Sequence, residues 1–166
     1  MKRIAVIGAT GLLGAPVTTE LIRAGFAVTI LAKDEAKARA KFGDGPTYVA
    51  GDLRDPAALT RLLTNQDGLY MSLSVKPDSG ETDYQPEREG IQAVLAVARQ
   101  VGLPRLGYLA GLVQRYQGTN GFDWWVYTLK IRPSNPFGRA GFRIFSTTRR
   151  RSWTTSTGAR SKTATP

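Results

Sequence analysis

The chain contains neither cysteine nor histidine, and these two absences exclude several kinds of chemistry. Without cysteine it can form no disulfide, no thiolate zinc site and no cysteine nucleophile. Without histidine it can form no Ser-His-Asp triad. We therefore predict no metal site. A chain without cysteine also fits a reducing compartment, and we expect a cytoplasmic protein.

Long hydrophobic runs are also absent, since no stretch of the sequence reaches the length of a membrane span. Residues 1–8 resemble a short secretory signal, because basic residues at the start are followed by an apolar stretch. Glycines interrupt that stretch, however, and it is better interpreted as a strand, a turn and the start of a helix. We accordingly expect no membrane partner.

Acidic residues are missing from one part of the chain only. The net charge is +10, which would suggest a nucleic acid partner if the charge were spread over the whole protein. Residues 1–131 are nearly neutral, with 15 basic and all 13 acidic residues, whereas residues 132–166 carry 8 basic residues and no acid. We therefore treat residues 1–131 as the folded domain and residues 132–166 as a basic, disordered tail, and we expect at most weak, non-specific binding of nucleic acid by that tail.

Apolar runs of strand length alternate with segments of helical periodicity along residues 1–131. Glycine or proline marks many of the boundaries between them, and acidic residues precede two of the helical segments. The sequence predicts strands over residues 4–7, 27–31, 47–50, 68–73 and 106–109, and helices over residues 12–24, 35–42, 56–63 and 87–101.

Strands that are separated by helical crossovers cannot pair as hairpins, so they form a parallel sheet with helices on both faces. The fold class is therefore α/β, a Rossmann-like doubly wound sheet with the strand order 3-2-1-4-5.

Three glycines in a G-x-x-G-x-x-G pattern join the first strand to the first helix. A glycine at the strand end permits the tight turn, the middle one lets a pyrophosphate approach the backbone, and the last allows close packing of the helix. The helix N-terminus then offers unpaired N–H groups to the phosphates. This pattern predicts binding of NAD(P) by residues Gly8, Thr10, Gly11, Leu12, Leu13 and Gly14.

The ends of the second and third strands predict the adenosine end of the site. Lys33 is the first charged residue beyond the second strand, and a cation there pairs with the 2′-phosphate of NADP rather than with the 2′-hydroxyl of NAD. We therefore predict NADP(H), with NAD as the alternative, and assign Asp34 to capping of the next helix. Beyond the third strand, Asp52 is either an acceptor for the adenine amino group or an ordinary loop carboxylate, and Leu53 is expected to pack near the base.

These segments, with residues 105–113, together resemble the NmrA-like, atypical branch of the short-chain dehydrogenase/reductase superfamily. The resemblance covers about residues 1–131 and implies NAD(P) binding without naming a substrate. It also implies that the loop after the fourth strand runs beside the nicotinamide, so Ser72 and Ser74 become candidate contacts.

The catalytic pattern that the resemblance implies, Tyr-x-x-x-Lys, is not met in this chain. Lys130 is preceded by Val126 at the position of the tyrosine, and Tyr127 is one residue too close. Lys130 is therefore a candidate ribose contact, and Tyr127 is a candidate catalytic residue or an aromatic that packs beside its tryptophan neighbours.

Helical and strand periodicities both vanish after residue 131, and three explanations stay open. The tail binds nucleic acid or acidic lipid, or an internal deletion has removed the helix that precedes the sixth strand, or the reading frame changes near residue 132, which is the explanation that we favour.

Two functions fit these observations. The first is an NADP(H)-dependent oxidoreductase of the atypical short-chain class, acting on an unknown small molecule. The second is a dinucleotide-sensing regulator without turnover, which the failed catalytic pattern favours.

Overall fold

The computed structural model describes residues 2–74, 79–80 and 82–109. Within these residues five strands form one sheet, and every pairing is parallel. The strand order is β3-β2-β1-β4-β5, which confirms the predicted topology. The strands are β1 (Arg3–Ile7), β2 (Ala27–Ala32), β3 (Thr47–Ala50), β4 (Gly68–Met71) and β5 (Leu106–Tyr108).

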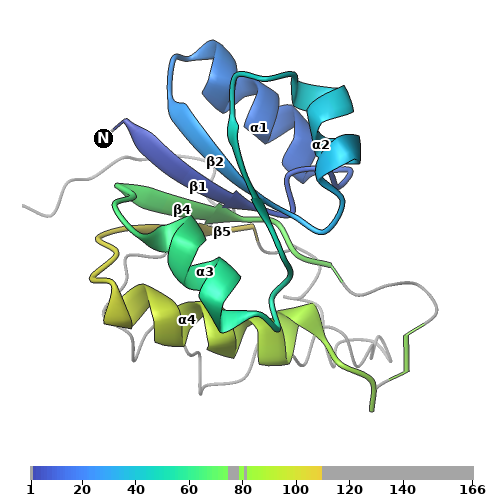
Figure 1. The fold of residues 1–166 in the computed structure, drawn as a ribbon. Coiled ribbons are helices and arrows are strands. Elements are labelled where there is room, and N and C mark those ends of the chain that lie inside the picture. Colours follow the sequence, from blue (N-terminus) through green and yellow to red (C-terminus); the bar gives the residue numbers. More distant parts are fainter. Residues whose placement is uncertain (1, 75–78, 81, 110–166) are drawn as a thin grey trace, which may run out of the picture.

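Helices cover both faces of the sheet, as a doubly wound fold requires. In Figure 1, α1 and α2 lie on one face, and α3 and α4 lie on the other. A short π-helical segment, η1, leads directly into α4. The helical segments are α1 (Gly14–Arg23), α2 (Glu35–Phe42), α3 (Pro56–Leu63), η1 (Pro86–Gly90) and α4 (Ile91–Gln100).

The central strand β1 supplies side chains to two separate cores, because successive side chains of a strand point to opposite faces. Ala5 and Ile7 belong to the larger core, which also contains buried residues of α3 and α4. Ile4 and Val6 belong to the smaller core, which contains Ala38 of α2. A strand that is buried on both faces explains why the sequence of β1 is a continuous apolar run.

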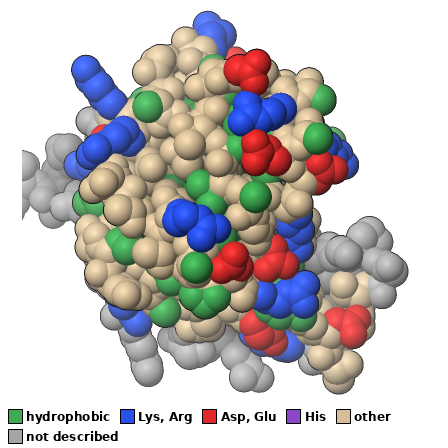
Figure 2. Space-filling model, viewed as in Figure 1, with side chains coloured by type: hydrophobic (Ala, Val, Ile, Leu, Met, Phe, Trp, Pro, Cys, Tyr) green, Lys and Arg blue, Asp and Glu red, His purple; other side chains and the backbone are tan. Residues whose placement is uncertain are grey.

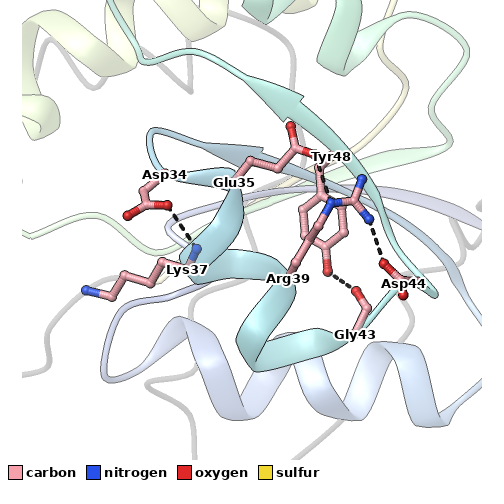
Figure 3. A network of polar contacts seen from close by, with 7 residues as sticks. All are labelled: Asp34, Glu35, Lys37, Arg39, Gly43, Asp44 and Tyr48. Atoms are coloured by element: carbon pink, nitrogen blue, oxygen red, sulfur yellow. Dashed lines mark hydrogen bonds and ion pairs between the residues drawn. The ribbon is translucent and has the colours of Figure 1, made fainter.

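A network of polar contacts ties α2 to the edge strand β3 (Figure 3). The guanidinium of Arg39 forms ion pairs with Glu35 at 2.9 Å and with Asp44 at 2.8 Å, and it lies 4.7 Å from the ring centroid of Tyr48. The Tyr48 hydroxyl donates to the Gly43 carbonyl at 2.6 Å. Because all these groups lie on α2, on β3 or between them, we assign the network to packing of the edge of the sheet.

Several predicted bounds differ from the structure by one residue, at the start of β1 and at the ends of α1, β2 and β5, and three differ by more. The first helix begins at Gly14 rather than at residue 12, so Leu12 and Leu13 lie in the turn and are 91% and 60% exposed. The fourth strand ends at Met71 rather than at residue 73. The single helix predicted over residues 87–101 is η1 followed by α4.

The surface of the described residues carries mixed charge. On the face seen in Figure 2, blue basic and red acidic side chains lie among each other, and green hydrophobic side chains are scattered. None of the helices within residues 2–74, 79–80 and 82–109 is long and apolar enough to cross a membrane. The end of the predicted domain 1–131, together with Tyr127, Lys130 and the predicted tail 132–166, lies outside the described residues.

Candidate functional site

The glycine turn between β1 and α1 is packed so closely that two of its glycines have no room for a side chain. Gly8 has a φ of +80°, and a Cβ added to it would lie 1.9 Å from the carbonyl oxygen of Ser72, just beyond β4. A Cβ added to Gly14 would lie 2.0 Å from the carbonyl oxygen of Gly8. The fold itself therefore requires glycine at these two positions.

Gly11 differs from the other two glycines of the turn. A Cβ added to it would meet one atom within 4 Å, the Gly8 carbonyl oxygen at 3.3 Å, and its φ is not in the left-handed region. Gly11 is exposed at the surface of the turn. A side chain there would require the Gly8 carbonyl to shift by a few tenths of an ångström, which is a much smaller obstacle than the overlaps at Gly8 and Gly14. Close approach of a ligand to the backbone gives a further reason for glycine at this position.

The N-terminus of α1 presents backbone N–H groups at the carboxyl end of β1. Leu13 occupies the N-cap position, and no side chain of the described residues caps the helix. Inside the helix, the hydroxyl of Thr18 donates to the Gly14 carbonyl at 2.8 Å. Within the first turn, the N–H of Ala15 already donates to the Gly11 carbonyl at 3.0 Å and Pro16 has no N–H. The remaining N–H groups at this end and the positive end of the helix dipole suit a phosphate group. From α2, Lys41 donates to the carbonyl of Thr10 at 3.4 Å and so brings a cation to the turn.

Lys33 and Asp34 have separate roles at the end of β2. The carboxylate of Asp34 accepts a hydrogen bond from the backbone N–H of Lys37 at 2.9 Å (Figure 3) and caps α2, as the sequence predicts. Lys33 is exposed, and its Nζ lies 3.6 Å from Oδ2 of Asp52. The strand ends therefore bring the predicted phosphate cation and the predicted adenine acceptor together.

Asp52 lies partly exposed, with 25% of its side chain accessible, at the carboxyl end of β3. Its Oδ1 accepts from the backbone N–H of Arg54 at 2.6 Å. This hydrogen bond, with the charges of Lys33 and Arg54, lowers the pKa of the Asp52 carboxyl against the opposing effect of burial. Asp52 is therefore an anion at neutral pH and can act only as an acceptor.

The other predicted contacts differ in their surroundings. Leu53 is 7% exposed and belongs to the larger core, so its side chain has a structural role, and its contact with a base stays a prediction. Ser72 follows β4, where its N–H donates to the Ile7 carbonyl at 3.0 Å, and it abuts Gly8. Ser74 is exposed. Both serines lie at the carboxyl edge where ligands of doubly wound sheets bind.

Two side chains at this edge were missed by the sequence prediction. The Arg54 guanidinium lies 5.0 Å from the ring centroid of Tyr84, and its Nη2 lies 3.4 Å from Oδ2 of Asp52. The position of Arg54, directly after Gly-Asp-Leu at a strand end, is a signal that could have identified it. Tyr84 precedes η1, and no local pattern points to it.

The residues present fit a dinucleotide. The turn offers a close approach to the backbone and uncapped N–H groups for a pyrophosphate, and the edge of the sheet carries cations, an anionic acceptor and hydroxyls. In contrast, no group of three or more acidic side chains in the described part of the chain is placed to hold a metal ion.

Comparison with known proteins agrees with this fit. Residues 8–134 match the family described as NAD(P)H-binding. An NAD(P)H azoreductase from Xenophilus azovorans is 36% identical over 75 residues, which are 45% of this chain and 26% of the azoreductase. The chain thus matches about a quarter of the length of that relative.

Solved structures share the fold at low sequence identity. The NADPH-dependent quinone oxidoreductase QOR2 from Escherichia coli, solved with NADPH, has a TM-score of 0.68 and 23% identity, and the match covers 86% of this chain and 47% of QOR2. An epimerase from Methanothermobacter thermautotrophicus has a TM-score of 0.70 and 22% identity, with coverage of 87% and 50%. With the family match over most of its length, the chain belongs to the NAD(P)H-binding family, and its cofactor is a nicotinamide dinucleotide.

Proposed function

We propose that the protein is an NADP(H)-dependent oxidoreductase of the atypical short-chain class. The observation that carries this proposal is the glycine turn, in which the exposed Gly11 lies beside the N-terminus of α1, and no side chain caps that terminus. That arrangement suits the pyrophosphate of a dinucleotide.

The remaining contacts follow from the direction in which a dinucleotide lies across the edge of such a sheet. The adenosine end lies over β2 and β3, where Lys33 pairs with the 2′-phosphate and Asp52 accepts from the adenine amino group. The nicotinamide end lies toward the end of β4, where Ser72 and Ser74 are candidates to hold it. We keep Lys130 as a candidate ribose contact and Tyr127 as a candidate proton donor.

When bound, the nicotinamide supplies the hydride, and the protein supplies binding and orientation. The azoreductase and the quinone oxidoreductase among the similar proteins suggest the substrate class. We propose a small, electron-poor acceptor, such as a quinone or an azo compound, that takes up a hydride and a proton.

Nucleotide sensing without turnover remains the second function. It is supported by Val126, which stands where a catalytic tyrosine is expected. The similar proteins named for reduction of substrates favour the enzyme instead.

A turnover assay tests the proposal. The purified 166-residue chain is mixed with NADPH, and the absorbance of NADPH is followed with a panel of quinones, azo dyes, aldehydes and ketones. We expect oxidation of NADPH with at least one quinone or azo dye, and no oxidation by a Gly11→Val variant. Binding of NADPH without turnover on any compound would refute the oxidoreductase and leave the sensor.

A further inference from the structure

Four side chains from three separate segments meet at the adenosine end of the site. We call them the adenosine-end cluster: Lys33, Asp52, Arg54 and Tyr84. Lys33 follows β2, Asp52 and Arg54 follow β3, and Tyr84 comes from the segment before η1. The cluster contains two cations and one anion, so it carries a net positive charge, and both cations are exposed.

Both cations of the cluster approach the same oxygen. Nζ of Lys33 lies 3.6 Å and Nη2 of Arg54 lies 3.4 Å from Oδ2 of Asp52, so the two nitrogens are at most about 7 Å apart. The other oxygen, Oδ1, is held by the backbone N–H of Arg54 at 2.6 Å. Oδ2 is therefore the shared counterion of the two cations, and Oδ1 fixes the carboxylate.

A phosphate group can span two cations at this separation. Two of its oxygens lie roughly 2.5 Å apart, and each accepts a charge-assisted hydrogen bond of about 2.8 Å, so one phosphate reaches donors up to about 8 Å apart. A phosphate oxygen can therefore pair with the same lysine and arginine as the carboxylate oxygen does. The phosphate also carries more negative charge than the carboxylate.

Tyr84 fixes the direction of the Arg54 side chain. Its ring lies 5.0 Å from the guanidinium, a distance at which a cation is attracted to an aromatic face. A Cβ added to Gly90 would lie 3.1 Å from the Tyr84 hydroxyl and 2.7 Å from Cδ1 of Leu53. The tyrosine thus packs against η1 and the larger core. Its ring is held in place by this packing and forms a fixed surface for the guanidinium of Arg54.

We propose that Arg54 is the second residue that selects the 2′-phosphate of NADP(H), acting with Lys33. Asp52 is the counterion that holds the two cations in place before the phosphate binds, and once the phosphate pairs with them its Oδ2 can accept from the adenine amino group. Tyr84 is a positioning residue for Arg54. The inference rests on the proposed function, because it names what distinguishes NADP(H) from NAD(H) at that same site.

The experiment uses adenosine fragments that lack the nicotinamide, so that binding does not depend on turnover. Affinities of the 166-residue chain for adenosine 2′,5′-bisphosphate and for adenosine 5′-monophosphate are measured by isothermal titration calorimetry. The ratio of the two affinities defines the preference for the 2′-phosphate. We expect the wild type to prefer the bisphosphate, and Arg54→Gln and Lys33→Gln each to reduce that preference about tenfold.

Further variants separate a role in selection from a role in folding. Arg54→Lys keeps the charge and should keep part of the preference. Tyr84→Phe keeps the platform and should leave the preference unchanged, whereas Tyr84→Leu should reduce it. Asp52→Asn removes the counterion and should raise the preference severalfold. The matched control is Arg99→Gln, the same change in the last turn of α4, which should alter neither affinity.

The outcomes separate this inference from the proposed function. An unchanged preference in a folded Arg54→Gln protein, or an equal loss of both fragments, would overturn the role of Arg54 alone. A wild-type protein that binds both fragments equally would overturn the inference and the proposed preference for NADP(H). It would leave open an oxidoreductase that uses NADH. Loss of all turnover with an intact preference for the bisphosphate would overturn the oxidoreductase and leave the inference standing.

Discussion

Substitution of Gly11 by valine is expected to abolish dinucleotide binding while the protein stays folded. The added Cβ would meet one atom within 4 Å, the Gly8 carbonyl oxygen at 3.3 Å, and the backbone of Gly11 is not in the left-handed region. An exposed substitution with so few new contacts changes the free energy of unfolding by about 0.5 to 1 kcal/mol. The same side chain would occupy the approach path of the pyrophosphate.

The loss of affinity is expected to be much larger than the loss of stability. Micromolar binding corresponds to about 8 kcal/mol, and a loss of more than about 3 kcal/mol would weaken it at least a hundredfold. The assay is a fluorescence titration of NADPH, combined with thermal unfolding followed by circular dichroism. A folded Gly11→Val protein that still binds NADPH at micromolar concentration would refute our assignment of the turn.

Two other glycines provide matched controls for this experiment. Gly45 lies in the loop between α2 and β3, and a Cβ added there has no described neighbour within 4 Å, so Gly45→Val should affect neither binding nor stability. Gly14→Val places a Cβ 2.0 Å from the Gly8 carbonyl oxygen and should lower the Tm as well as the affinity. A similar Tm for Gly14→Val and the wild type would show that the packing of the turn is described incorrectly.

Three further predictions concern stability. Asp55 caps α3 by accepting from the N–H groups of Ala57 and Ala58 at 2.9 and 3.0 Å, so Asp55→Ala should cost about 1 kcal/mol in urea unfolding and Asp55→Asn much less; equal losses would contradict the cap. Asn65 has a φ of 59°, so Asn65→Val should destabilise the protein by about 1 to 2 kcal/mol and Asn65→Gly should not, and thermal unfolding that ranks the two variants the other way would be inconsistent with this backbone. Asp67 accepts hydrogen bonds from the N–H groups of residues 2 and 3, and these bonds are the main reason why its pKa is lowered. A carboxyl with a lowered native pKa stabilises the protein above its unfolded pKa of about 3.9, and this stabilisation is lost as the pH falls below that value. Asp67→Asn should therefore flatten the acid limb of the stability curve, and an unchanged limb would exclude this role.

The elements whose ends are set by local chemistry were predicted from the sequence with their correct bounds. Helices α2 and α3 begin directly after Asp34 and Asp55, whose carboxylates cap them in the structure. Both caps and the proline at the first position of α3 are signals carried by the residues themselves. The order of the strands also followed from the sequence, because crossover connections leave few possible topologies.

The wrong start of α1 arose because two apolar residues before it are not buried. Leu12 and Leu13 continue the apolar periodicity of α1 backward, yet they lie exposed in the turn. The π-helical segment before α4 was missed for a different reason. The carbonyl of Gln85 accepts from the N–H groups of residues 88, 89 and 90 at 3.0, 3.0 and 3.4 Å, and such a widened turn has no signature in residue composition.

The candidate site was predicted in its parts but not in its connections. Lys33 and Asp52 were each identified from their place after a strand, whereas their ion pair depends on how two strand ends meet. The pairing of Arg54 with Tyr84 joins residues 30 positions apart, and it requires the loop after β3 to lie beside the segment before η1. No local pattern contains that information, because it is a property of the packed sheet.

The most direct test of the account is a titration of the 166-residue chain with NADPH and with NADH, followed by the fluorescence of the reduced nicotinamide. We predict binding of NADPH with a Kd of roughly 1 to 10 µM and weaker binding of NADH, since the cations at the ends of β2 and β3 have no phosphate to hold in NADH. Equal affinity for the two would contradict the role of Lys33, and no binding of either at about 1 mM, which corresponds to about 4 kcal/mol, would contradict the account as a whole.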